Sequence, residues 1–225
     1  MPAVKSNFSR AVWAVMAKDA ICELRTRYAA GALSMFALTT LSSVSMSLAG
    51  TALTPAVAAA LLWVVLFFCA MAGLSRVFLQ EQEAGTLPGL MLYAPGLSVF
   101  FGKLLFNLVL LTGLALLVVP LFIIFFNAQV AGWPSLALVL ALGNAGIAAV
   151  ATLTAAMIMY VQGKHAIFSV LTFPVLLPQF LNAIGATAGI LGGGVPDSSA
   201  LVFMAGYDAA MVAAGILLFE YLWQA

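Results

Sequence analysis

Six long apolar stretches, separated by short polar segments, make up most of this chain. A helix needs about 20 consecutive, mostly apolar residues to cross the hydrocarbon core of a bilayer, and each stretch is long enough to do so. The pattern therefore predicts an all-α, polytopic membrane protein with six transmembrane helices in a single domain, residues 1–225. The predicted spans cover residues 29–49, 56–75, 104–126, 135–160, 166–190 and 200–223.

The segment before the first span, residues 1–28, has a two-sided helical pattern. At 100° per residue, the cations Arg10, Lys18 and Arg25 share one face. This arrangement predicts an amphipathic helix that lies in the membrane interface with its cations toward the headgroups. The opposite, apolar face consists of Phe8, Ala11, Val12, Val15, Met16 and Cys22.

Two acidic residues break the pattern of this interfacial helix. Asp19 and Glu23 project toward the apolar face, and like charges four residues apart repel each other. Two interpretations stay open. The pair is either a solvated acidic turn near the helix end, or it is docked against another part of the membrane machinery.

The cations of the chain predict its orientation. All eight Lys and Arg residues lie in residues 1–28, in residues 76–103 or in the turn around Lys164. Because cytoplasmic loops collect Lys and Arg, we expect both termini to be cytoplasmic and the number of crossings to be even. The composition, 65% hydrophobic and 7% charged, indicates that the bilayer is the main solvent, since a soluble surface needs far more charge.

Polar residues and prolines also occur inside the predicted spans. Thr39, Ser43 and Ser47 follow one another at intervals of four residues in the first span. Such a stripe suits a contact between helices or a polar groove, but hydroxyl groups in helices also bond to their own carbonyls. In the fifth span, Pro174 and Pro178 predict a kinked or broken helix.

The last span contains one acidic residue, Asp208, about a third of the way in from its outer side. Ionisable groups at such a depth are costly, and they are usually paired or face water. Either the span begins later and Asp208 lies near the outer headgroups, or Asp208 is a polar point in a helix interface or a lateral groove.

The polar segment at residues 76–103 is the longest predicted internal loop, and it carries the strongest signal. Glu81 and Glu83 would extend the second helix into the cytosol, and Gly85 would end it. Thr86 can then cap a second, short helix.

That short helix would present an apolar ridge to the cytosol. Leu87, Leu90 and Met91 follow the spacing i, i+3, i+4, and Leu92 comes next. An apolar ridge on the cytosolic side favours a hydrophobic groove on a partner, which is the form of a coupling helix pushed by an ATPase. The alternative is a re-entrant or interfacial helix that touches only lipid.

Catalytic signatures are missing from the sequence. His165 is the only histidine, so a two-histidine metal motif cannot form. Neither a phosphate-binding Gly-rich loop nor a Gly-x-Ser-x-Gly nucleophile elbow occurs. We therefore expect a non-catalytic membrane subunit that binds no metal or cofactor directly.

Three groups of motifs extend over nearly the whole chain. They are Lys18-Asp19-x-x-x-Glu23-x-Arg25; the run from Leu62-Trp63 through Gly73-Leu-Ser-Arg76 and Glu81-x-Glu83-x-Gly85-Thr86-Leu87 to Lys103-x-x-x-Asn107; and Phe173-Pro174-x-x-x-Pro178 with Asp208 and Phe219-Glu220-Tyr221. The chain resembles the CcmB family in these motifs. This family comprises the haem exporter protein B permeases of bacterial cytochrome c maturation.

The resemblance implies an ABC-2-type permease of the bacterial inner membrane that works as a dimer with a separate ABC ATPase, CcmA. CcmC and the small CcmD would join this complex. ATP hydrolysis on CcmA would then drive release of the haem-loaded periplasmic chaperone CcmE, with haem itself a candidate substrate. The alternatives are an ABC-2-type permease that exports another substrate, or a membrane scaffold that transports nothing.

Overall fold

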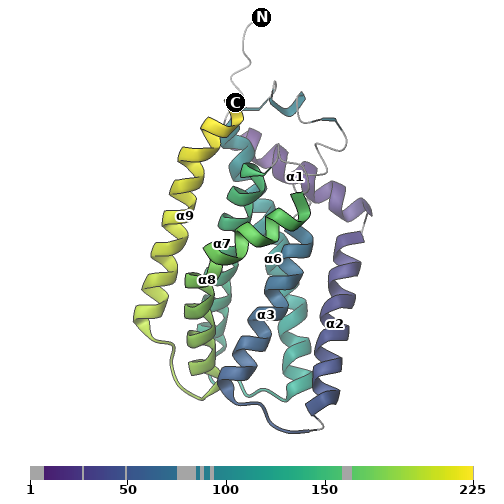
Figure 1. Ribbon diagram of the computed structural model, residues 1–225, viewed down its shortest axis with the longest axis vertical. Helices are drawn as coiled ribbons and strands as arrows, with labels where there is room; N and C mark the ends of the chain where they lie inside the picture. Colours follow the sequence, from purple (N-terminus) through teal and green to yellow (C-terminus); the bar gives the residue numbers. More distant parts are fainter. Residues whose placement is uncertain are drawn as a thin grey trace, which may run out of the picture.

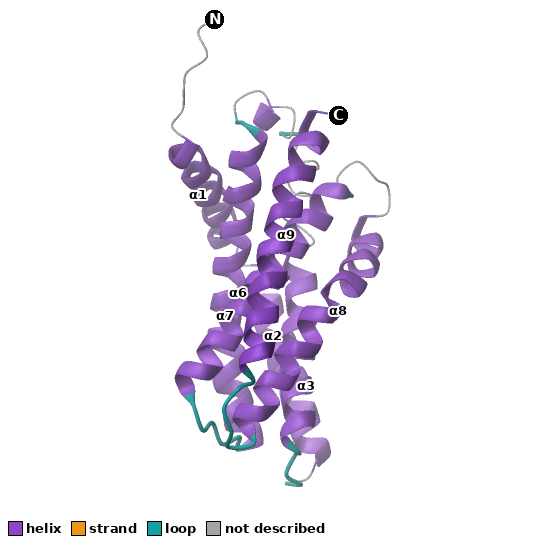
Figure 2. Cartoon of the chain, turned by 90° about the vertical axis from the view of Figure 1, so that its left-hand side faces the viewer, coloured by secondary structure: helices purple, strands orange, loops and turns teal. Residues whose placement is uncertain are grey.

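The fold is described from a computed structural model, which covers residues 8–26, 28–48, 50–74, 85–86, 89–91, 94–158 and 164–224. These residues contain helices and turns but no strand (Figures 1 and 2). The helices are α1 (Phe8–Thr26), α2 (Tyr28–Leu48), α3 (Pro55–Leu74), α6 (Gly96–Phe126), α7 (Trp133–Met157), α8 (Lys164–Leu191) and α9 (Ser198–Gln224).

Six of these helices, α2, α3 and α6 to α9, are long and apolar enough to cross a membrane. The expected all-α polytopic fold with six spans is therefore confirmed for the part of the chain that the structure describes. The third span differs from its prediction, because α6 begins at Gly96 rather than at residue 104. Residues 96–103 belong to this helix and not to the preceding loop.

The long helices run side by side, and α1 lies obliquely across one end of the bundle (Figures 1 and 2). Phe8 of α1 and Trp223 of α9 line the same groove at that end. We refer to it as the termini end. Because both ends of the described chain meet there, the number of crossings between them is even, as the charge pattern predicts.

The central helices are α3 and α7, and the peripheral ones are α2 and α9. Inside the bundle, 67% of the span residues of α3 and α7 are buried, against 17% for α2 and α9. The outer faces of α2 and α9 are accordingly apolar surfaces available to lipid or to other chains.

The central contact joins α3, α7 and α8 through a single tryptophan. The Trp63 ring packs so tightly on Gly143 that a Cβ atom at position 143 would come within 2.0 Å of it. The indole Nε1 donates a hydrogen bond to Thr187 Oγ1 over 2.9 Å. Next to it, Phe67 of α3 meets the rings of Phe173 and Phe180 edge to face. The fit of a large residue on a glycine fixes the relative positions of these three helices.

The fifth span, α8, is bent but not broken at its prolines (Figure 1). Proline removes a backbone N–H and clashes with the preceding turn, which explains the bend. Side chains bind the carbonyls around it: Tyr207 of α9 donates to Val175 O, and Asn182 Nδ2 donates to Pro178 O over 2.9 Å. The bend is therefore fastened to α9.

Two of the three hydroxyls in the stripe of α2 bond to carbonyls of their own helix. Thr39 Oγ1 donates to Met35 O over 2.8 Å, and Ser47 Oγ donates to Ser43 O over 2.8 Å. For Thr39 and Ser47 this fits the interpretation in which the hydroxyls bond to their own helix. Off this stripe, Ser45 Oγ reaches Phe125 O at the end of α6 over 3.0 Å.

Candidate functional site

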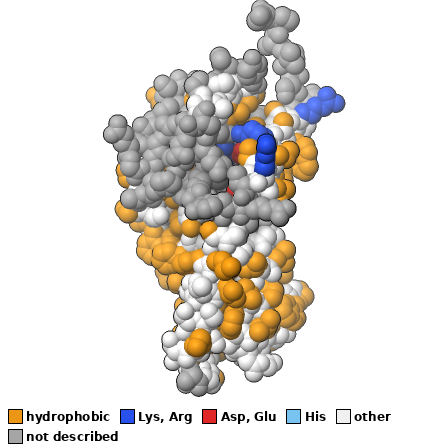
Figure 3. Space-filling model, turned by 90° about the vertical axis from the view of Figure 1, so that its right-hand side faces the viewer, with side chains coloured by type: hydrophobic (Ala, Val, Ile, Leu, Met, Phe, Trp, Pro, Cys, Tyr) orange, Lys and Arg blue, Asp and Glu red, His pale blue; other side chains and the backbone are white. Residues whose placement is uncertain are grey.

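The predicted coupling segment lies at the termini end, where the cationic side chains gather on the face drawn in Figure 3. The structure describes four of its predicted residues, Gly85, Thr86, Leu90 and Met91. The other four lie outside the described residues: Glu81, Glu83, Leu87 and Leu92.

The described part of this segment contains a helical turn. The backbone N–H of Leu90 donates to Thr86 O, and that of Ala94 donates to Leu90 O, both over 3.0 Å. Gly85, before the turn, has a φ of +66°, a conformation that glycine adopts at low cost. The position therefore has the geometry expected of a glycine that ends a helix.

The apolar ridge on this turn is seated on the bundle along one side. Leu90 and Met91 are half-buried and pack against the hydrophobic core. Gly85, Thr86 and Gly89, which precede Leu90 in the chain, are exposed. A Cβ atom at Gly89 would meet nothing within 4 Å. Of the described residues of this segment, Leu90 and Met91 thus face the core, and Gly85, Thr86 and Gly89 are exposed.

A groove of about 380 Å³ lies beside the turn. Met91 and Pro95 form one wall, and Phe8 of α1 and Glu220 and Trp223 of α9 complete it. It therefore brings together the turn, the beginning of α1 and the end of α9.

The beginning of α6 is wedged against the end of α9 below this groove. The Trp223 ring covers Gly96 so closely that a Cβ atom there would lie 2.9 Å from it. Phe100 packs on Phe219 with ring centroids 5.4 Å apart, and a Cβ atom at Gly215 would come within 2.3 Å of Phe100. The beginning of α6 and the end of α9 are therefore closely packed against each other.

The helix α1 is docked on α6 through a buried ion pair. Lys103 is fully buried, and its Nζ donates to Asp19 Oδ2 over 3.2 Å. Asp19 Oδ1 lies 3.0 Å from Lys18 Nζ. For Asp19, this geometry fits the interpretation in which the acidic residue is docked rather than solvated. The partner was missed because Lys103 was assigned to a polar loop.

A glycine allows α1 to come this close to α6. A Cβ atom at Gly102 would lie 2.7 Å from Val15 Cβ and 2.9 Å from Val12 O. Val12 and Val15 of the predicted apolar face are buried in this contact. Phe8 and Cys22 of the same face are exposed on the protein surface.

The two remaining predicted residues of this helix have different surroundings. Arg25 is exposed. Glu23 is half-buried and borders an apolar groove between α1, α2 and α6, together with Leu24, Leu33 and Leu110. Arg25 thus lies on the outer surface, whereas Glu23 lies at the border of that groove.

A second polar contact lies one turn deeper along α6. Asn107 Nδ2 donates to Thr152 Oγ1 of α7 over 2.8 Å, and this hydroxyl donates to Ala148 O over 2.7 Å. Lys103 and Asn107 are four residues apart, so they lie on the same face of the helix. That spacing was visible in the sequence as a signal for a polar face turned toward the protein.

Asp208 forms an intramembrane polar centre with α7 and α8. Gln179 Nε2 donates to Asp208 Oδ1 over 2.9 Å and lies 3.3 Å from Leu142 O. Gly146 leaves the space for this pair, since a Cβ atom there would lie 2.7 Å from Asp208 Oδ1. Asp208 is roughly 15 Å along α9 from Ser198. It lies where α7, α8 and α9 meet, which fits the interpretation of Asp208 as a polar point in a helix interface.

The partner of Asp208 was not predicted from the sequence. Gln179 is almost completely buried, and its Oε1 has no hydrogen-bond partner, like Asp208 Oδ2. A glutamine one residue after a proline in an apolar span was the available signal, because polar side chains in spans mark contacts between helices.

One comparison with known proteins gives a match. The family model for CcmB protein matches residues 10–219. No curated protein and no solved structure matches the chain. The matched region contains five of the six apolar helices completely and α9 as far as residue 219, together with the described part of the segment at residues 85–94 and the three polar contacts described above. The chain therefore belongs to the CcmB family, the permease components of the haem-exporting ABC transporter for cytochrome c maturation, and it is a multi-pass membrane protein.

Proposed function

We propose that this chain is the membrane subunit that couples ATP hydrolysis by a separate ATPase, CcmA, to release of the haem-loaded chaperone CcmE. The observation that carries the proposal is the family match over residues 10–219. In this proposal the protein hydrolyses no ATP itself. It transmits a movement of the ATPase to the helices that it places in the membrane.

The turn at residues 86–94 is the proposed point of contact with the ATPase. Its outer side is exposed at Thr86 and Gly89, and its inner side packs on the core through Leu90 and Met91. A push on the turn would be transmitted to α6 and α9, because Phe100 and Phe219 are in direct contact just below it. In this proposal Glu81, Glu83, Leu87 and Leu92, which lie outside the described residues, also belong to the predicted ATPase contact.

The proposed orientation places the termini end in the cytoplasm and the protein in the inner membrane. The exposed cations Arg10, Lys18 and Arg25 lie at that end, which agrees with the positive-inside rule. The loop before α9 carries an anion, Asp197, at the opposite end. Hydrogen bonds from the side chain and backbone of Ser199 lower the pKa of Asp197, so this outer loop stays negatively charged at neutral pH.

We assign the protein a mechanical role first and a role as a haem conduit second. The sequence offers no pair of histidines as axial ligands for haem, since His165 is its only histidine. In the proposed complex two copies of this chain work with CcmA, and CcmC and CcmD join them. ATP binds to the ATPase, and haem reaches the complex on its way to the chaperone.

A substitution at Gly89 tests the coupling without disturbing the bundle. Because a side chain at this position would meet nothing within 4 Å, Gly89→Trp adds bulk only on the outer side of the turn. We expect the purified complex to retain its subunits and to lose ATP-driven release of haem-loaded CcmE. The matched control is Gly206→Trp on the exposed side of α9, where the space is also open and release should be unchanged.

Three results would contradict this function. Normal release with Gly89→Trp would remove the turn from the mechanism. Purification in mild detergent without any ATPase would favour a passive scaffold. A deletion strain that makes normal c-type cytochromes but accumulates another compound would favour a permease for a different substrate.

A further inference from the structure

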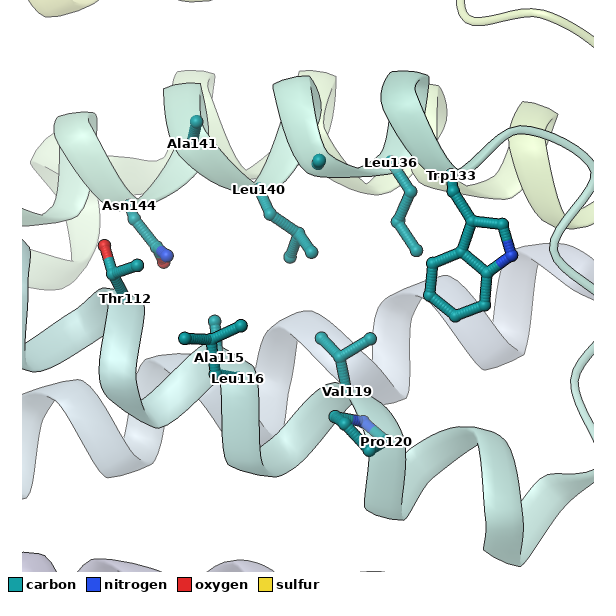
Figure 4. Close-up of a pocket in the computed structure, with 11 residues that line it drawn as sticks. Thr112, Ala115, Leu116, Val119, Pro120, Trp133, Leu136, Leu140, Ala141 and Asn144 are labelled. Atoms are coloured by element: carbon teal, nitrogen blue, oxygen red, sulfur yellow. The ribbon is translucent and has the colours of Figure 1, made fainter.

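A groove opens sideways between α6 and α7, away from the coupling turn. It has a volume of about 290 Å³, and its walls are almost entirely apolar (Figure 4). Residues of α6 form one wall and residues of α7 the other, with Trp133 at the end of the groove where α7 begins. The groove is a lateral one because Leu116 and Ala141 on its two walls are both exposed on the side of the bundle.

The feature that sets this groove apart is a polar side chain in its apolar wall. Asn144 is only 3% exposed, and its Oδ1 has no hydrogen-bond partner. Its side chain points into the groove toward Thr112 (Figure 4). Thr112 does not serve it, because the Thr112 hydroxyl donates to Leu108 O in its own helix over 2.7 Å. A polar atom left without a partner in hydrocarbon is costly.

The depth of Asn144 excludes lipid as the missing partner. Asn144 lies roughly 16 Å along α7 from Trp133, whereas half of the hydrocarbon core measures about 15 Å. The amide is therefore near the middle of the bilayer, where acyl chains have no hydrogen-bond donor and headgroups do not reach. The partner of Asn144 must therefore carry its polar side chain to this depth on a transmembrane helix, because the backbone polar groups of such a helix are satisfied internally.

The walls of the groove have the shape that a helix needs. Ala137 and Ala141 are exposed on α7 four residues apart, and Ala115 faces them from α6. Small residues at this spacing let two helix backbones come close together, and hydrogen bonds between side chains then add to the contact. The Asn144 amide in this wall favours a docked helix that carries a hydroxyl or amide group at the same level.

We propose that the groove is the docking site for a transmembrane helix of a different subunit, which carries a serine, threonine, asparagine or glutamine opposite Asn144. A second copy of this chain is a poorer occupant. Thr39 is the exposed hydroxyl near the middle of α2, and it already donates to Met35 O over 2.8 Å. It has no proton left for Asn144 Oδ1.

Photocross-linking from Leu116 in native membranes that contain the whole complex tests this docking site. Leu116 is 72% exposed on the wall of the groove. The matched control is Leu181 of α8, which is 67% exposed and equally far from the end of its helix. We expect Leu116, but not Leu181, to capture one other membrane polypeptide through a span with a hydroxyl or amide residue.

Two variants connect that product to the groove. Asn144→Leu should lower its yield roughly three- to tenfold, the effect of one hydrogen bond between membrane helices. Ala137→Phe fills the groove from an exposed position, so it leaves the fold intact and should abolish the product. Capture of lipid alone, of a second copy, equal capture from Leu181, or a yield that neither variant changes would each overturn the proposal. None of these results bears on the coupling turn, which is tested separately.

Discussion

At the residue scale, glycines decide where the polar and aromatic side chains of this protein can sit. Gly146 leaves room for the Asp208–Gln179 pair, and Gly143 leaves room for Trp63. Alanine is normally better than glycine in a helix by about 1 kcal/mol. These two positions reverse that preference, because the added methyl group would overlap a neighbour that the fold holds in place.

Gly146→Ala should therefore destabilise the protein. Its Cβ atom would lie 2.7 Å from Asp208 Oδ1 and 2.8 Å from Gln179 Nε2, and such overpacking costs about 1–3 kcal/mol. Thermal unfolding in detergent would show a lower midpoint. Gly185→Ala on α8 is the matched control, because its Cβ atom meets nothing within 4 Å. Equal midpoints for the two variants would mean that the polar centre is loosely packed.

The buried ion pair makes a second prediction at this scale. Asp19→Asn and Lys103→Met should each destabilise the protein by about 3 kcal/mol, since each removes one partner of a buried pair. The double variant should recover part of this loss, because it leaves neither charge behind. A double-mutant cycle of unfolding free energies measures the coupling between the two residues. Additive losses would show that the pair does not act as a unit.

At the element scale, the six spans could be predicted because their signal is simple. A run of about 20 apolar residues is enough to identify a membrane helix. The start of α6 could not be predicted in the same way, since Lys103 resembles the end of a loop unless its partner on α1 is known. Asp208 could be identified as a candidate because an acidic residue inside an apolar span is unusual. Gln179 could not be identified as its partner, because the pairing depends on how α8 and α9 pack.

The prediction of an interfacial helix left open which part of the protein α1 contacts, and this part is α6. Gly102→Ala should lift α1 off α6, because its Cβ atom would lie 2.9 Å from the backbone oxygen of Val12, which cannot rotate away. We expect faster tryptic cleavage at Arg10, Lys18 and Arg25 in membranes. Gly113→Ala, further along α6, meets open space and should leave the cleavage rate unchanged. Identical digestion of both variants would contradict the docking of α1.

At the scale of the whole molecule, the termini end collects the parts that would have to move together. The coupling turn, the beginning of α6, the end of α9 and the docked α1 are in direct contact there. The opposite half of the bundle holds the Asn144 groove. The family and the number of spans follow from the sequence, whereas this division depends on contacts between residues far apart in the chain.

The proposed function requires that the turn after the second span touches the ATPase. Thr86 is exposed beside that turn, and Cys22, the exposed natural cysteine, can be replaced by serine. The most direct measurement is cross-linking from Thr86→Cys in this Cys22→Ser background, in membranes that are hydrolysing ATP. We expect a covalent product with the ATPase subunit whose yield changes with nucleotide. A product with phospholipid alone during turnover would contradict it.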